Sequence, residues 1–215
     1  MKSTSLENRV AVPLLLCLAL AACSRREASP SAEASPPPVA AGSTAAPTAA
    51  MGEAIYALKI DLIDQAGATV PLDVYRGHPV LIAMFYGTCP AACPTLTTDI
   101  KNIEEELTPS ERADLRVLMV SFDPERDTPA TLGALAAKHR IDTSRWRFAT
   151  SSESTVRELS AVLGVQYRKI DKGEFSHSTS IVLLDREGVI RAQIDGLRQP
   201  SGALVAKLRS LPGPP

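Results

Sequence analysis

Two strongly apolar runs constrain the fold of this chain more than any other feature: Pro79–Phe85 (PVLIAMF), which is apolar throughout, and Leu115–Phe122 (LRVLMVSF), whose only polar residues are Arg116 and Ser121. Runs of this length without polar alternation are typical of strands that are buried on both faces. Between them, Thr95–Leu107 has apolar residues three or four positions apart, which is the spacing of one helix face. The order strand, helix, strand therefore predicts an α/β domain around a buried sheet.

The rest of the C-terminal part continues this alternation. Helices are expected where Thr128 and Ser152 provide N-cap side chains. These patterns predict one domain over residues 53–215, with a mixed central sheet and helices on both faces. The further elements we expect are strands at Ala54–Leu62, Thr69–Leu72 (after a turn at DQAG), Arg147–Ala149, Ile181–Asp185 and Val189–Ile194, and helices from Thr128 to about His139, Ser152 to Leu163 and about Ser201 to Leu211.

Residues 1–22 have the composition of an export signal. Lys2 and Arg9 precede a short apolar run, which is too short to span a membrane. The run ends in LAAC, which is similar to the bacterial lipobox, so we expect a lipoprotein signal peptide and lipidation of Cys23. Cys17 would leave with the signal. The alternative is a plain signal peptide with Ala-X-Ala-type cleavage and an incidental cysteine.

Residues 23–52 are rich in Pro, Ala and Ser and show no hydrophobic period. Such a segment buries too little apolar surface to offset the entropy of ordering, so we expect a disordered tether. About 29 residues of coil reach roughly 30 Å. We therefore expect the domain in the periplasm of a bacterial cell envelope, anchored to a membrane by lipid; Ser24 alone does not decide between inner and outer membrane.

The charge distribution argues against nucleic acid as a partner. The formal net charge is −1, and no cluster of Lys and Arg would form a basic face. We expect a monomer that binds no nucleic acid.

The stretch YGTCPAACP contains the cysteine pair, Cys89 and Cys93, four residues apart. Cys89 is expected between a buried strand and a helix, where the first amides of the helix lower the pKa of a thiol. If the turn is helical, both sulfurs lie on one face and could form a disulfide or bind a soft metal ion. A purely structural disulfide is the third reading, but so short a loop would add little stability.

The three histidines differ in their surroundings. His78 and His139 are expected at the surface, in a turn and near a helix end. His177 is expected in a polar loop that leads into the strand SIVLLD. A loop histidine alone is more often not a metal ligand.

Four stretches together resemble the Sco/SenC family of thioredoxin-fold copper proteins. TCPAACP is close to the family pattern T-x-C-P-x-x-C-P, and VSFDPERDTP is close to V-S-x-D-P-x-x-D-T-P. HSTSIVLLDREG and the lead-in from DQAG to GHPVLI complete the match, which spans about Asp61 to Leu197. The resemblance implies a thioredoxin-like fold, in which the loop with His177 faces the cysteine turn.

The resemblance also implies that Cys89, Cys93 and His177 bind copper, as Cu(I) or Cu(II). Soft thiolates with an imidazole suit this metal. Asp123 and Asp127 would lie near the site, although both could be plain turn residues. Ser176 stands where many members have an aspartate beside the histidine, Tyr86-Gly87-Thr88 replaces G-Y-T, and residues 165–177 are short where some members have a longer hairpin.

The family delivers copper to the dinuclear centre of cytochrome c oxidase subunit II, or reduces the cysteines that will hold it. We therefore expect a metallochaperone rather than an enzyme, with subunit II or a related copper protein as its partner. The alternative is a periplasmic thiol–disulfide reductase that uses Cys89 and Cys93. His177 and the absence of proline in Ser176–Thr179 favour the metal. A peroxiredoxin-like peroxidase is disfavoured because P-x-x-x-T-x-x-C is missing.

Overall fold

A computed structural model describes residues 54–89, 92–170 and 173–213, without the side chains of residues 92 and 93. All described residues belong to one compact unit. The expected signal peptide, tether and lipidated Cys23 lie outside the described residues and stay predictions. Within the described ranges, no helix has the length and apolar character needed to cross a membrane.

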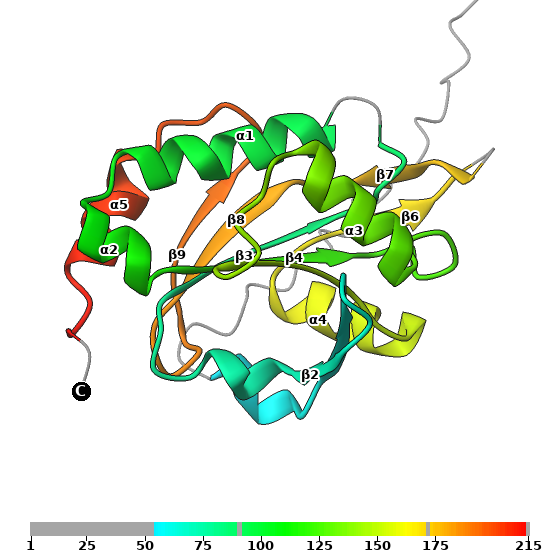
Figure 1. The fold of residues 1–215 in the computed structure, drawn as a ribbon, viewed down its shortest axis with the longest axis horizontal. Coiled ribbons are helices and arrows are strands. Elements are labelled where there is room, and N and C mark those ends of the chain that lie inside the picture. The colour runs from blue at the N-terminus through cyan, green and yellow to red at the C-terminus, as the bar shows by residue number, and fades with distance from the viewer. Residues whose placement is uncertain (1–53, 90–91, 171–172, 214–215) are drawn as a thin grey trace, which may run out of the picture. The chain divides into compact units, whose positions relative to one another are not determined.

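The domain is built on a mixed seven-stranded sheet of order β2-β1-β5-β4-β3-β8-β9 (Figure 1). Strands β3, β4 and β5 are parallel to one another, while β1, β2, β8 and β9 pair antiparallel with their neighbours. The expected mixed sheet is confirmed. The strands are β1 (Asp61–Asp64), β2 (Thr69–Pro71), β3 (Val80–Phe85), β4 (Arg116–Ser121), β5 (Trp146–Thr150), β8 (Ser180–Leu184) and β9 (Ile190–Asp195).

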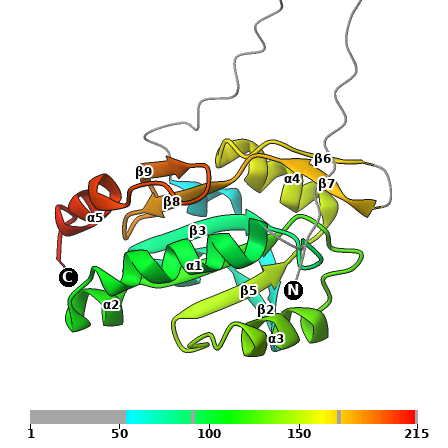
Figure 2. The same cartoon turned by 90° about the horizontal axis from the view of Figure 1, so that it is seen from above.

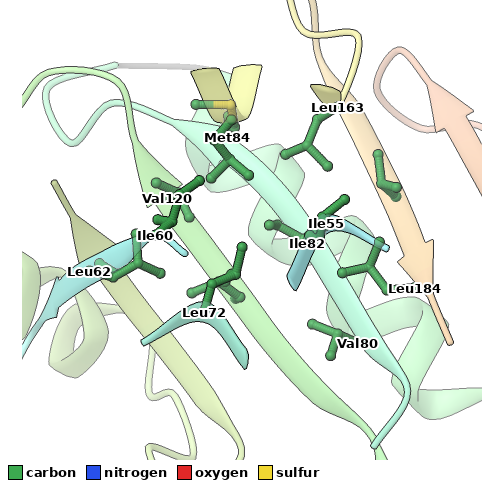
Figure 3. Close-up of a cluster of buried hydrophobic side chains, with 14 of the residues drawn as sticks. Ile55, Ile60, Leu62, Leu72, Val80, Ile82, Met84, Val120, Leu163 and Leu184 are labelled. Atoms are coloured by element: carbon green, nitrogen blue, oxygen red, sulfur yellow. The ribbon is translucent and has the colours of Figure 1, made fainter. Parts of the chain in front are cut away.

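Helices cover both faces of the sheet, as expected. One face packs against α1 (Ala92–Glu105), α3 (Pro129–Lys138) and α5 (Gly202–Arg209), and the other against α4 (Glu153–Val162) (Figures 1 and 2). Every residue of β3 is buried, because its side chains alternate between the two cores. Figure 3 shows the core on the α4 side, where Ile82 and Met84 of β3 meet Leu163.

The local signals for helix ends are confirmed. The side chain of Thr128 accepts a hydrogen bond from the Thr131 amide, and Ser152 accepts one from Thr155. Each such cap contributes about 1 kcal/mol. Gly164 has a φ of 69° just after α4, a conformation that glycine adopts without strain.

Three elements differ from the sequence expectation. Within Ala54–Leu62, residues Ile55–Leu58 form the 3-10 helix η1, and Ala54 makes an isolated bridge to Val189. A second 3-10 helix, η2 (Leu72–Tyr75), follows β2. The short helix α2 (Pro109–Asp114) has a capping box but no buried residue, so it left no hydrophobic period to detect.

The segment before β8 also differs from the sequence expectation, and this difference matters most for function. The expected polar loop is instead a two-stranded hairpin of β6 (Tyr167–Lys169) and β7 (Phe175–His177), which is separate from the main sheet. Its strands have three residues each, and half-buried Phe175 points toward the core on the α4 side. Strands so short and so exposed leave little alternation in the sequence.

Candidate metal and redox site

The cysteine pair lies between the end of β3 and the first turn of α1. Cys89 ends a turn after β3, and its amide donates to the Tyr86 carbonyl at 3.2 Å. Its half-buried side chain packs against the cores on both sides of the sheet. The backbone of Cys93 is in the first turn of α1, which starts three residues before the expected Thr95. The first amides of a helix have no acceptor within it, so this end favours negative charge near Cys89.

His177 is the last residue of β7. Strand β7 lies at the end of the sheet where α1 starts (Figures 1 and 2). Its Nδ1 lies 2.9 Å from the carbonyl oxygen of Ser178. A carbonyl only accepts, so we assign the ring proton to Nδ1, which leaves the Nε2 lone pair of the neutral ring for a ligand. Metal-binding histidines commonly donate their other N–H in this way. Where many family members have an aspartate, at Ser176, this chain has no carboxylate, and the ring bonds to the Ser178 carbonyl.

Tyr86 contacts both parts of the site. Its hydroxyl donates to Glu174 Oε2 at 2.9 Å, and its side chain lies close enough to Cys89 for that thiol to act on the phenol. Burial raises the pKa of Tyr86, and the interactions with Glu174 and Cys89 raise it further, so the phenol stays neutral. Its ring meets the imidazole of His177 edge-on, with centroids 5.7 Å apart. Sequence reasoning singled out neither Tyr86 nor Glu174; the position of Tyr86, directly after the buried strand, was the one available signal.

An aromatic cluster surrounds the imidazole. The ring of Phe122, the residue after β4, lies 4.9 Å from that of His177 and 5.1 Å from that of Phe175. The cluster limits how far the imidazole can turn and keeps one side of it away from water. Its members are Tyr86, Phe122, Tyr167, Phe175 and His177.

Asp127 holds the cysteine turn. Its buried carboxylate accepts the Gly87 amide at 2.7 Å and the hydroxyl of Ser121. Burial raises the pKa of Asp127 and the nearby Asp123 adds to this, while the bonds from Ser121 and Gly87 offset part of the rise. A Cβ at Gly87 would collide with this carboxylate, so the close approach requires glycine.

Asp123 acts on the other half of the site, through Arg126. The buried Asp123 carboxylate accepts from the guanidinium of Arg126, which also donates to the Gly173 carbonyl at the hairpin tip. The same guanidinium lies 5.9 Å from the ring centroid of Phe175. The motif VSFDPERDTP therefore connects to both the cysteine turn and the hairpin with His177.

The other two histidines have structural roles in their own parts of the fold. His78 is half-buried, and its Nδ1 lies 2.9 Å from Asp114 Oδ1. His139 caps α3, where burial lowers its pKa with Lys138 and Lys101 adding to the effect. Among the residues with described side chains, no three His, Cys, Asp or Glu side chains form a metal site. Cys93 is not in that set.

Comparison with known proteins agrees with the fold and motifs. A model of the SCO1/SenC family matches residues 49–212. A SCO1 protein homolog from Bacillus subtilis is 24% identical over 151 residues, which cover 68% of this chain and 78% of that protein.

Solved structures with the same fold include two Sco proteins. BsSco, described as having a disulfide switch and belonging to the Sco family of cytochrome c oxidase assembly proteins, matches with a TM-score of 0.61 at 25% identity, over 70% of this chain and 90% of that one. ScoI from Bradyrhizobium japonicum, solved with copper bound, matches with a TM-score of 0.58 at 24% identity, over 70% and 96%. The shared architecture is thioredoxin-like, as expected. Since the family model spans most of the sequence, this chain belongs to the SCO1/SenC family.

Proposed function

We propose that this protein binds copper through Cys89, Cys93 and His177 and serves the assembly of the dinuclear copper centre of cytochrome c oxidase. It either delivers copper to subunit II or reduces the cysteines that will hold the metal. One observation supports this most strongly: Tyr86 touches both Cys89 and the imidazole of His177, whose Nδ1 is occupied by a carbonyl.

The side chains of Cys89, Cys93 and His177 suit copper as cargo. Thiolates are soft ligands that suit Cu(I), and an imidazole extends the set toward Cu(II). The copper-bound Sco relative and the family's link to oxidase assembly support this choice. We further propose that lipid on Cys23 anchors the protein and that the domain works in the periplasm.

The placement of the cysteines favours a second candidate, thiol–disulfide reduction. Cys89 precedes α1 and Cys93 is in its first turn, at the end of a helix that stabilises a thiolate. In this reaction the two thiols lose two electrons and two protons as their S–S bond forms, and a substrate disulfide gains them. Both candidates use the same sulfurs, so loading copper and forming the disulfide exclude each other.

The deciding experiment measures copper bound per reduced monomer under anaerobic conditions, beside the same protein after oxidation. We expect one Cu(I) per reduced monomer and none after oxidation, because the disulfide consumes both thiolates. Cys89→Ser and Cys93→Ser should each lose tight Cu(I) binding. Equal loading of oxidised and reduced protein would contradict the shared-sulfur site. Reduced wild type that binds no copper but reduces a model disulfide would favour the reductase.

A further inference from the structure

The hairpin that carries His177 is not part of the main sheet. Strands β6 and β7 hydrogen-bond to each other as a separate two-stranded sheet. The place of His177 relative to Cys89 therefore depends on side-chain contacts and on the short connection to β8. Arg126 fixes the tip of the hairpin at Gly173, but that contact is at the far end from His177.

Tyr86 connects the hairpin with the cysteine turn at the end nearer His177. It lies directly after β3, three residues before Cys89, and Glu174 is 88 residues further along the chain. The hydroxyl donates to Glu174, and the ring packs against Phe175 (5.2 Å between centroids) and His177 (5.7 Å). One buried side chain thus holds three positions of the hairpin and contacts Cys89.

We propose that Tyr86, fixed by the carboxylate of Glu174, is a positioning residue that sets the place of the His177 imidazole relative to the sulfur of Cys89. The inference rests on the proposed copper site and adds to it two residues that do not bind the metal. The hydroxyl has one proton to donate, and Glu174 takes it.

The competing explanation is that Tyr86 is an ordinary core aromatic residue. Its ring contacts would then matter and its hydroxyl would not. Tyr86→Phe separates the two, because phenylalanine keeps the ring and loses the hydroxyl, with its bond to Glu174. Glu174→Ala removes the same link from the other side, at an exposed residue whose loss leaves the core intact.

The test is Cu(II) binding, followed by the absorption and paramagnetic resonance spectra of the loaded protein. Tyr86→Phe and Glu174→Ala should each weaken Cu(II) binding by about 10–100-fold and shift the thiolate-to-copper absorption band, as when a metal ligand loses its orienting partner. Cu(I), for which two thiolates suffice, should change much less. The double variant should be no worse than either single variant, because both break one link.

Two further variants distinguish positioning from loss of stability. Glu174→Gln keeps an oxygen that accepts the Tyr86 hydroxyl and should restore the wild-type spectrum. Tyr56→Phe is the matched control, since Tyr56 is also buried and its hydroxyl has no partner among the described residues. We expect it to leave the spectrum unchanged.

A metal-free measurement keeps the inference testable whatever the copper result. In reduced protein without metal, Tyr86→Phe and Glu174→Ala should shift the NMR resonances of the His177 ring and of the β7 amides. Wild-type spectra and copper affinities in both variants would overturn the inference while leaving the proposed function intact. Failure of wild type to bind copper would refute the proposed function, and the metal-free spectra would then decide the inference alone. If Tyr86→Phe does not fold, Glu174→Ala carries the test.

Discussion

At the scale of single residues, His78 and His177 differ in the hydrogen-bond partners of their ring nitrogens. Both ring nitrogens of His78 are hydrogen-bonded: Nδ1 bonds to the Asp114 carboxylate, and Nε2 accepts from Arg116 at 3.3 Å. His177 uses Nδ1 on the Ser178 carbonyl, and its Nε2 has no hydrogen-bond partner within the described residues. Of these two, only His177 has a lone pair to offer a metal. The sequence predicted His177 but not its bond to Ser178, because a main-chain acceptor has no sequence signature.

His177→Ala should weaken Cu(II) binding by at least about 10–100-fold, since losing a ligand costs no less than losing its orienting partner. Cu(I) binding should fall less, because two thiolates can hold it in a linear site. Reduction of a model disulfide should continue at close to the normal rate. Competition titrations with both copper states would measure this.

The control for that variant is His139→Ala, which changes the cap of α3 and should leave copper binding unchanged. His78→Ala is a poorer control, because it removes one of the two side chains, His78 and Arg186, that hydrogen-bond to the Asp114 carboxylate. If His177→Ala binds both copper states like the wild type, the ligand assignment is wrong and the reductase becomes the better candidate.

At the scale of elements, the site is where the cysteine turn, the turn after β4 and the β6–β7 hairpin meet. Strands β3 and β4 were predictable because burial on both faces leaves β3 wholly apolar and β4 apolar between Arg116 and Ser121. The β6–β7 hairpin could not be predicted in the same way, because its contacts, such as that of Tyr86 with Glu174, join residues 88 positions apart in the sequence. Its correct placement requires the fold, which the motif resemblance supplied only in outline.

The contact of Asp127 with the cysteine turn should appear in the pH dependence of stability. Burial raises the pKa of Asp127, so the folded state binds this proton more tightly than the unfolded chain. Its contribution to the free energy of unfolding is fully present below the unfolded value, about 3.9, and is lost as pH rises through the native value. Asp127→Asn keeps a carbonyl oxygen for Gly87 but cannot ionise, so its unfolding free energy should lack this decline.

Urea unfolding at a series of pH values would measure both curves, with equal m-values as the check on two-state behaviour. Asp142→Asn offers a contrast of opposite sign. Hydrogen bonds from the Ser144 side chain and amide and from Arg145 lower the pKa of Asp142, so its small contribution is present at neutral pH and lost on acidification. Parallel curves for wild type and Asp127→Asn would show that Asp127 titrates normally.

At the scale of the whole molecule, the chain combines a folded domain with an N-terminal part whose role the sequence alone predicts. The described domain places Cys89 against both cores, so the site rests on the most buried part of the sheet. The tether and anchor follow from composition and from LAAC, and they stay predictions.

Cys23→Ser should release the domain from the membrane. Several acyl chains on one cysteine bind a membrane stably, whereas one chain binds weakly and reversibly. Without the cysteine no lipid is attached, and we expect the protein in the soluble periplasmic fraction with its copper binding unchanged. Fractionation and the mass of the mature N-terminus would measure this.

Retention of the signal in the variant would itself hold the protein at the membrane, so the mass must first show that the signal is gone. A cleaved Cys23→Ser protein that still sediments with membranes would contradict the anchor and point to a membrane contact made by the domain itself.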